Sequence, residues 1–231
     1  MSAATAAGAP DRAALLTALG VDIDAVLLET ALTHRSYAYE HGTADNERLE
    51  FLGDSVLGRA VTAMLYARYP DDDEGALAKR RAGLVSTVAL ASIARTHALG
   101  AHLRLGRGEV RTRGAEKPSI LADAVEALIG ATFLSAGSEA AEALVLRLVQ
   151  PLVDDPASTG AITDPKTALQ EAAARRNAPP PVYDVTGEGP EHARLFTATV
   201  TAAGVVASGT GTSKKQAEVA AAWEAYRALD A

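Results

Sequence analysis

An acidic cluster at helical spacing is the first feature of this sequence that could do chemistry. In the stretch 46–55, which reads NERLEFLGDS, the acids Glu47, Glu50 and Asp54 stand at i, i+3 and i+7 and so share one face of a helix. Like charges at this spacing oppose a helix by about 0.2 to 0.5 kcal/mol per pair. The cluster therefore predicts a bound cation or another source of positive charge.

A second acidic pair lies in a much more apolar segment. Asp123 and Glu126, again at i and i+3, are the only charged residues in 118–138. An ionised carboxylate is costly to bury unless it is paired or bound to a metal. The structural alternative is that the face is exposed, or that Arg48, Arg80 or another distant arginine pairs with these acids.

Oxygen-only ligands favour a hard cation such as magnesium, for which manganese can substitute, over zinc or copper. Carboxylates that converge on one or two magnesium ions can activate a water and stabilise the leaving oxygen of a phosphodiester. A di-iron site would need Glu-x-x-His pairs, and none of the five histidines lies three residues after a Glu. The acids 71–74 directly follow Pro70, where helix capping is expected, and Glu74 is kept as a candidate.

The elements that must position these acids fall into two parts. From 11 to 153 the apolar residues recur at helical spacing, which predicts an all-α domain. Its expected helices span 12–19, 23–32, 46–69, 75–98, 118–134 and 139–152. A linker over 154–163 precedes a small α+β domain over 164–231, in the order α-β-β-β-α. Its expected elements are a helix over 165–176, strands over 182–186, 195–201 and 205–210, and a helix over 213–229.

Composition bounds the function less sharply. Taken alone, the net charge of -7 over 231 residues argues against a nucleic-acid partner. Residues 1–155 carry -6 of this charge, and only -2 remains there when Glu50, Asp54, Asp123 and Glu126 are set aside. The absence of cysteine excludes thiolate zinc sites and fits a cytoplasmic location. Residues 1–10 read as a disordered tail without a secretory signal. The apolar segment 118–138 has two acids near its middle, at about 2.5 to 3.5 kcal/mol each in a bilayer, so no membrane is expected.

The last helix opens on a basic tip. Ser213 and Gln216 form an S-x-x-Q capping box, and Lys214 and Lys215 stand between them. A helix N-terminus already prefers anions, so an external phosphate would explain the two lysines, although a solvated pair is the plainer alternative. The stretch 209–214 lacks the G-x-x-x-x-G-K spacing, so no nucleotide cofactor is expected.

Six motifs follow one another along the chain: LTHRS (32–36), NERLEFLGDS (46–55), DEG (73–75), SILADAVEALIG (119–130), DPKTALQE (164–171) and SKKQAE (213–218). Together they resemble those of bacterial ribonuclease III with its C-terminal double-stranded RNA-binding domain. The motifs are long, follow the family's order and cover residues 11–229. Glu218 departs from many RNA-binding domains outside this enzyme, which carry lysine there.

The resemblance implies a double-strand-specific endoribonuclease that is magnesium-dependent, with Asp54 and Glu126 as catalytic residues. Glu50 and Asp123 would complete the metal ligands, with Glu47 and Glu74 as accessory acids. The family works as a homodimer that leaves 5'-phosphates and short 3' overhangs in rRNA and mRNA precursor processing.

The resemblance also implies a set of RNA contacts in the second domain. They are Thr167, Gln170 and Glu171 on the first helix, His192 in the first strand-strand loop, and Lys214 and Lys215 at the phosphate clamp. His34, Arg35 and the stretch 104–113 fit either an RNA contact or a structural role. The rival hypotheses are a non-catalytic double-stranded RNA-binding scaffold and a metal-dependent phosphohydrolase of small molecules.

Overall fold

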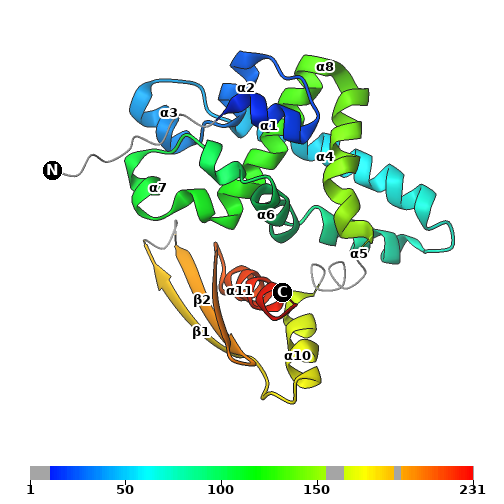
Figure 1. The fold of residues 1–231 in the computed structure, drawn as a ribbon, viewed down its shortest axis with the longest axis vertical. Coiled ribbons are helices and arrows are strands. Elements are labelled where there is room, and N and C mark those ends of the chain that lie inside the picture. Colours follow the sequence, from blue (N-terminus) through cyan, green and yellow to red (C-terminus); the bar gives the residue numbers. More distant parts are fainter. Residues whose placement is uncertain (1–10, 155–163, 190–193, 231) are drawn as a thin grey trace.

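The computed structural model describes residues 11–154, 164–189 and 194–230 of the chain, arranged as a helical part above a small sheet-containing part (Figure 1). The predicted tail 1–10, nearly all of the predicted linker and His192 lie outside these residues. The helical elements of the first part are α1 (Arg12–Leu19), α2 (Ala25–Ala31), α3 (Arg35–His41), α4 (Glu47–Arg68), α5 (Glu74–Leu84), α6 (Thr87–Thr96), η1 (Leu99–His102), α7 (Arg107–Arg111), η2 (Gly114–Glu116) and α8 (Pro118–Asp154). The all-α prediction for this part is confirmed.

Helices α4 and α8 form the centre of the helical part, and two glycines let them approach closely. A Cβ atom built on Gly53 would lie 1.8 Å from the carbonyl oxygen of Glu126. A Cβ atom built on Gly130 would lie 2.2 Å from the carbonyl oxygen of Leu49. Since no real Cβ fits at these distances, both positions require glycine. The contact fixes the acidic segment of α4 against that of α8.

The prediction of one helix over 75–98 is wrong, because the chain breaks between α5 and α6. The Ser86 side chain accepts a hydrogen bond from the Ala89 N–H and caps a new helix. The two helices predicted over 118–134 and 139–152 are confirmed, because α8 is interrupted at Gly137, whose φ of 86° and ψ of 177° are not helical. The short helices α3 and α7 have no counterpart in the sequence-based prediction.

Helix α8 is long and apolar enough to cross a membrane by length and composition alone. In this structure 61% of its apolar window is buried inside the protein. Its apolar residues, Leu121, Val125 and Leu128 among them, belong to the main hydrophobic core. The helix therefore reads as the core helix of a globular fold.

The second part contains α10 (Pro165–Arg175), β1 (Val182–Glu188), β2 (Leu195–Ala202), β3 (Val205–Gly211) and α11 (Lys214–Asp230). The strands form an antiparallel sheet in the order β1-β2-β3, which confirms the predicted α-β-β-β-α arrangement. Ala217, Ala221 and Ala225 of α11 are fully buried, and their small side chains let this helix pack closely on the sheet. A Cβ atom on Gly209 would lie 2.2 Å from the Ala221 nitrogen, so this strand residue must also stay small.

The two parts touch through α6 and α11. Val88 and Ala89 of α6 belong to the hydrophobic cluster of the second part. An ion pair of 2.7 Å joins Arg95 of α6 to Glu224 of α11. The second part thereby lies against the helical part, with the β1–β2 end of its sheet toward α7 (Figure 1).

Candidate active site

Three carboxylates from two helices converge in the helical part. One oxygen each of Glu50, Asp123 and Glu126 lies within 4.8 Å of the others, and all three residues are half-buried. Glu50 comes from the first turns of α4, while the other two lie one turn apart in α8. The glycine contact between these helices brings the two sequence clusters together.

Asp54 lies one turn beyond Glu50 on α4 and is exposed. Its oxygens are outside the group of three, but its charge acts on Glu126 directly. The four acids thus share one electrostatic environment, with Asp54 at its edge.

Burial and mutual repulsion raise the pKa values of the three half-buried carboxylates. Burial raises the pKa of Glu126 to about 8, helped by the charges of Asp54, Asp123 and Glu50. Burial likewise raises the pKa of Asp123 to about 6, with the Glu50 charge as the next cause. The pKa of Glu50 is raised by burial and then by the neighbouring Glu47. Such a cluster gains free energy when a divalent cation replaces its protons.

The arginines named as structural partners lie elsewhere or have other contacts. Arg80 binds Asp72 at 2.7 Å and stacks on the Tyr69 ring. Arg48 is exposed on α4 and does not line the carboxylate hollow. The positive charge that does act on the cluster is Arg35, which lowers the pKa of Asp123 against the effect of burial.

The accessory acids Glu47 and Glu74 lie in different places. In this chain Glu47 is beside the carboxylate cluster and Glu74 is not. Glu47 is exposed and contacts Arg35 at 3.5 Å next to the carboxylates. Glu74 lies on α5 and lines a separate hollow of about 390 Å³ with Thr62, Tyr66 and Arg81. The capping role expected for the neighbours of Glu74 is confirmed at Asp73, whose side chain accepts from the Ala76 N–H.

A hollow of about 790 Å³ lies next to the carboxylates and draws its walls from both parts of the chain. Glu50, Asp123 and their neighbours form one side, and the second part contributes Arg194, Phe196 and Thr212. Nothing in the sequence places Arg194 or Thr212 there, since more than 65 positions separate them from the acids.

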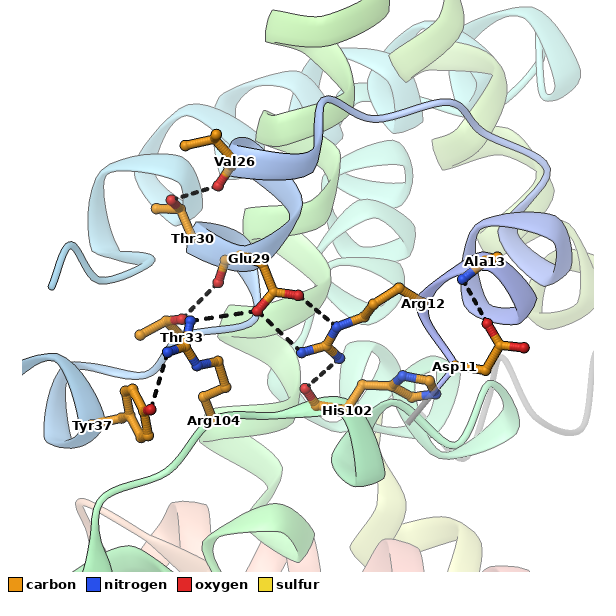
Figure 2. Close-up of polar contacts among 10 residues, drawn as sticks. All are labelled: Asp11, Arg12, Ala13, Val26, Glu29, Thr30, Thr33, Tyr37, His102 and Arg104. Atoms are coloured by element: carbon orange, nitrogen blue, oxygen red, sulfur yellow. Dashed lines mark hydrogen bonds and ion pairs between the residues drawn. The ribbon is translucent and has the colours of Figure 1, made fainter. Parts of the chain in front are cut away.

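His34 and Arg35 form one wall of this hollow, and a polar network that includes Thr33 and Tyr37 ties this part of the chain to the rest of the fold (Figure 2). Glu29 is the centre of the network: Arg12 donates to one oxygen at 2.7 Å and Arg104 to the other at 3.4 Å. The hydrogen bond from Arg12 is the main reason that the pKa of Glu29 is lowered. Arg104 also donates to the Tyr37 hydroxyl at 3.0 Å, and its carbonyl accepts from the His34 N–H at 3.1 Å. Burial lowers the pKa of His34, which favours a neutral ring at this wall.

The predicted RNA-contacting residues of the second part are exposed. They are Thr167, Gln170 and Glu171 on α10, and Lys214 and Lys215 at the start of α11. Half of the predicted capping box is formed, since the Gln216 N–H donates to Ser213 Oγ at 3.2 Å, while the Gln216 side chain accepts from the Thr212 N–H at 3.0 Å. Glu218 binds Lys166 of α10 at 2.7 Å, which explains how an acid is accommodated on this helix.

Comparison with known proteins agrees with this geometry. A family model described as "Ribonuclease-III-like" matches residues 24–152, and one described as "Double-stranded RNA binding motif" matches residues 165–229. The chain is 63% identical over 221 residues to a "Ribonuclease 3" of Leifsonia xyli subsp. xyli, covering 95% of this chain and 93% of that protein.

The chain belongs to the ribonuclease III family.

Two further relatives support this assignment. A ribonuclease III family member from Mycobacterium tuberculosis, named "Ribonuclease 3", is 52% identical over 227 residues and shares 95% of each chain. A solved nuclease domain of ribonuclease III from Campylobacter jejuni matches with a TM-score of 0.58 and 42% identity, over 61% of this chain and 97% of that one. Membership of the family makes the protein an endoribonuclease and makes the carboxylate cluster its candidate active site.

Proposed function

We propose that the protein is a magnesium-dependent endoribonuclease that cuts both strands of double-stranded RNA, leaving 5'-phosphates and short 3' overhangs, and that it processes rRNA and mRNA precursors. The observation that carries this proposal is the convergence of Glu50, Asp123 and Glu126 within 4.8 Å. Three carboxylates at this separation, without a paired arginine or lysine among them in the described chain, suit a hard divalent cation.

The raised pKa values of the clustered carboxylates fit a bound metal ion. Glu126 and Asp123 have raised pKa values because they are half-buried among like charges, and a cation would relieve that cost. We assign Glu50, Asp54, Asp123 and Glu126 as the metal-holding set. When bound there, magnesium supplies Lewis-acid activation of a water and stabilises charge on the phosphodiester oxygens.

The chain itself contributes the positions of these groups. Helices α4 and α8 are rigid supports in the main core, so their side chains need little reorganisation to hold a cation. Asp54 and Glu126 lie where α4 and α8 meet, and we assign them the catalytic role. Asp54 is exposed, whereas Glu50, Asp123 and Glu126 are half-buried.

The second part supplies duplex binding in this proposal. Lys214 and Lys215 stand in the first turn of α11, where free N–H groups and the helix dipole also favour a phosphate. Thr167, Gln170 and Glu171, which are exposed on α10, would form the first-helix contact surface for the duplex. Such domains span about 16 bp and recognise A-form shape and 2'-hydroxyls more than sequence.

A duplex of that length is far larger than the hollow of about 790 Å³ that the two parts enclose. The α6–α11 contact, with its Arg95–Glu224 ion pair, must therefore open before RNA reaches the carboxylates. The Arg95 and Glu224 side chains are 26% and 29% exposed in this contact, and opening it would return both charges to water.

A homodimer completes the proposal. Large apolar side chains stand exposed on the two central helices, with Phe51 at 79%, Tyr66 at 75% and Leu134 at 53%. Exposed side chains of this size on the same pair of helices favour a contact with another protein chain. The solved Campylobacter jejuni nuclease domain is described as structurally flexible in a region involved in its dimer formation.

The test is cleavage of an end-labelled RNA duplex in magnesium, in manganese and in chelator. We expect short products with 5'-phosphates and 3' overhangs in either metal and intact RNA in chelator. Binding without cleavage in both metals would instead support the scaffold hypothesis.

A further inference from the structure

Arg35 occupies a place at the active site that the family resemblance does not assign. It is the first residue of α3, and 72% of its side chain is exposed. It lines the hollow of about 790 Å³ that contains Glu50 and Asp123. It also lines an adjoining hollow of about 690 Å³ beside Tyr39. The guanidinium therefore stands at the rim shared by the carboxylate site and the neighbouring surface.

The positive charge of Arg35 acts on Glu50 and Asp123 electrostatically, while its ion pair is with Glu47. It lowers the pKa of both Glu50 and Asp123, opposing burial. Among the described residues its ion-pair partner is Glu47, at 3.5 Å, whose side chain is itself 54% exposed. Exposed pairs of this length contribute little and are readily exchanged for a better anion.

The other basic side chains that line the same hollow, Lys117 and Arg194, have other contacts. Among the described residues that line it, the lysine and arginine side chains are those of Arg35, Lys117 and Arg194. Lys117 donates to Glu109 at 2.6 Å and is only 18% exposed. Arg194 belongs to the second part and lies over the Phe196 ring. Of the described residues of the nuclease part that line this hollow, Arg35 is thus the exposed cation.

The backbone that carries Arg35 is held in place. The preceding residue, His34, donates its N–H to the Arg104 carbonyl, and Arg104 is bound in turn to Glu29 (Figure 2). Two residues after Arg35, the Tyr37 hydroxyl accepts from Arg104 and its ring lies 4.3 Å below that guanidinium. A side chain on a fixed helix start can present its charge with little loss of freedom on binding.

We propose that Arg35 binds a backbone phosphate of the RNA strand beside the bond that is cut. The inference rests on the proposed function, since it takes the carboxylate cluster as the cleavage site. A guanidinium can hold two phosphate oxygens at once through parallel N–H donors, which an ammonium cannot do. Arg35 would release Glu47 and place the phosphate next to Glu50 and Asp123.

The test measures the salt dependence of duplex binding in magnesium, in a Glu126→Gln background that leaves the RNA uncut. Each phosphate contact contributes about -0.9 to the slope of log K against log salt. We expect Arg35→Ala and Arg35→Gln to reduce the slope by about one and to weaken binding about tenfold. Arg35→Lys should keep the slope while weakening binding. Arg227→Ala, which removes one exposed charge from the far end of α11, should leave the slope unchanged.

Glu47→Gln separates a phosphate contact from a purely structural ion pair. If Arg35 served only to hold Glu47, this variant would reproduce the effect of Arg35→Ala; we expect it to leave the slope at the parent value. Equal slopes for Arg35→Ala, Arg35→Gln and the parent, with circular dichroism showing folded protein, would overturn the assignment. Cleavage of duplex by the wild-type protein in the same preparation shows whether the proposed function stands, independently of Arg35.

Discussion

Replacing Glu126 by glutamine should make the metal-free protein more stable at alkaline pH, even though it removes a group of the active site. The glutamate is half-buried among Asp54, Asp123 and Glu50, and these surroundings raise its pKa from 4.5 to about 8. A glutamine of the same shape carries no charge to bury. The free energy of unfolding of the two proteins should therefore diverge as pH rises.

The sign and size follow from proton linkage. Between the unfolded and folded pKa values the folded protein holds a proton on Glu126 that the unfolded chain has lost, so stability falls as pH rises. Below the unfolded pKa both states are protonated, and above the folded pKa the loss is complete. Each pH unit in this window removes about 1.4 kcal/mol, or roughly 4 kcal/mol between about pH 5 and pH 8. Because the carboxyl is partly exposed and screened by water, we take about 2 kcal/mol as the expected difference.

The assay is urea unfolding at about pH 5 and pH 8 in chelator, followed by circular dichroism. Glu126→Gln should gain about 2 kcal/mol relative to wild type between these two conditions. Glu139→Gln, at an exposed position of α8 beyond the break at Gly137, should follow the wild-type pH dependence. A wild-type pH dependence in Glu126→Gln would refute the claim that clustering and burial raise this pKa. Added magnesium should stabilise wild type more than the variant, because the variant has lost one ligand.

Further predictions concern the helix contact and the RNA clamp. Gly53→Ala should destabilise the fold by about 3 kcal/mol or more, because its Cβ would overlap the Glu126 carbonyl at 1.8 Å. Gly58→Ala on the same helix meets nothing within 4 Å and should instead stabilise by about 0.5 to 1 kcal/mol, as thermal melts can show; equal effects would contradict the close packing of α4 and α8. Lys214→Ala and Lys215→Ala should each lower the salt slope of duplex binding by about one, and an unchanged slope would count against a phosphate contact.

Much of the fold follows from local patterns. The i, i+3, i+7 spacing of Glu47, Glu50 and Asp54 fixes their shared face once α4 is helical. The change from helical spacing to short strands predicts the second part, and its order is confirmed. The alanines at 217, 221 and 225 predict the close seat of α11 on the sheet, because only small side chains permit it.

What the sequence does not reveal depends on contacts between distant segments. The sequence does not predict the helix break at Ser86, because apolar residues continue at helical spacing across it. The break is marked by the Ser86 side chain, which caps α6. Arg35 lies about 90 positions from Asp123, so no local pattern places its charge at the carboxylates. The family resemblance groups Glu74 with the other acids. In this chain Glu74 lies on α5 and lines a hollow separate from the carboxylate cluster.

The central claim is that the carboxylates of α4 and α8 cut double-stranded RNA with a bound divalent metal. The most direct measurement compares wild type and Glu126→Gln on a labelled RNA duplex, in magnesium and in chelator, beside a single-stranded control. We expect both proteins to bind the duplex equally and only wild type to cut it, in magnesium alone, with the single strand left intact. Wild-type turnover by Glu126→Gln in magnesium, or duplex cleavage by wild type in chelator, would contradict the account.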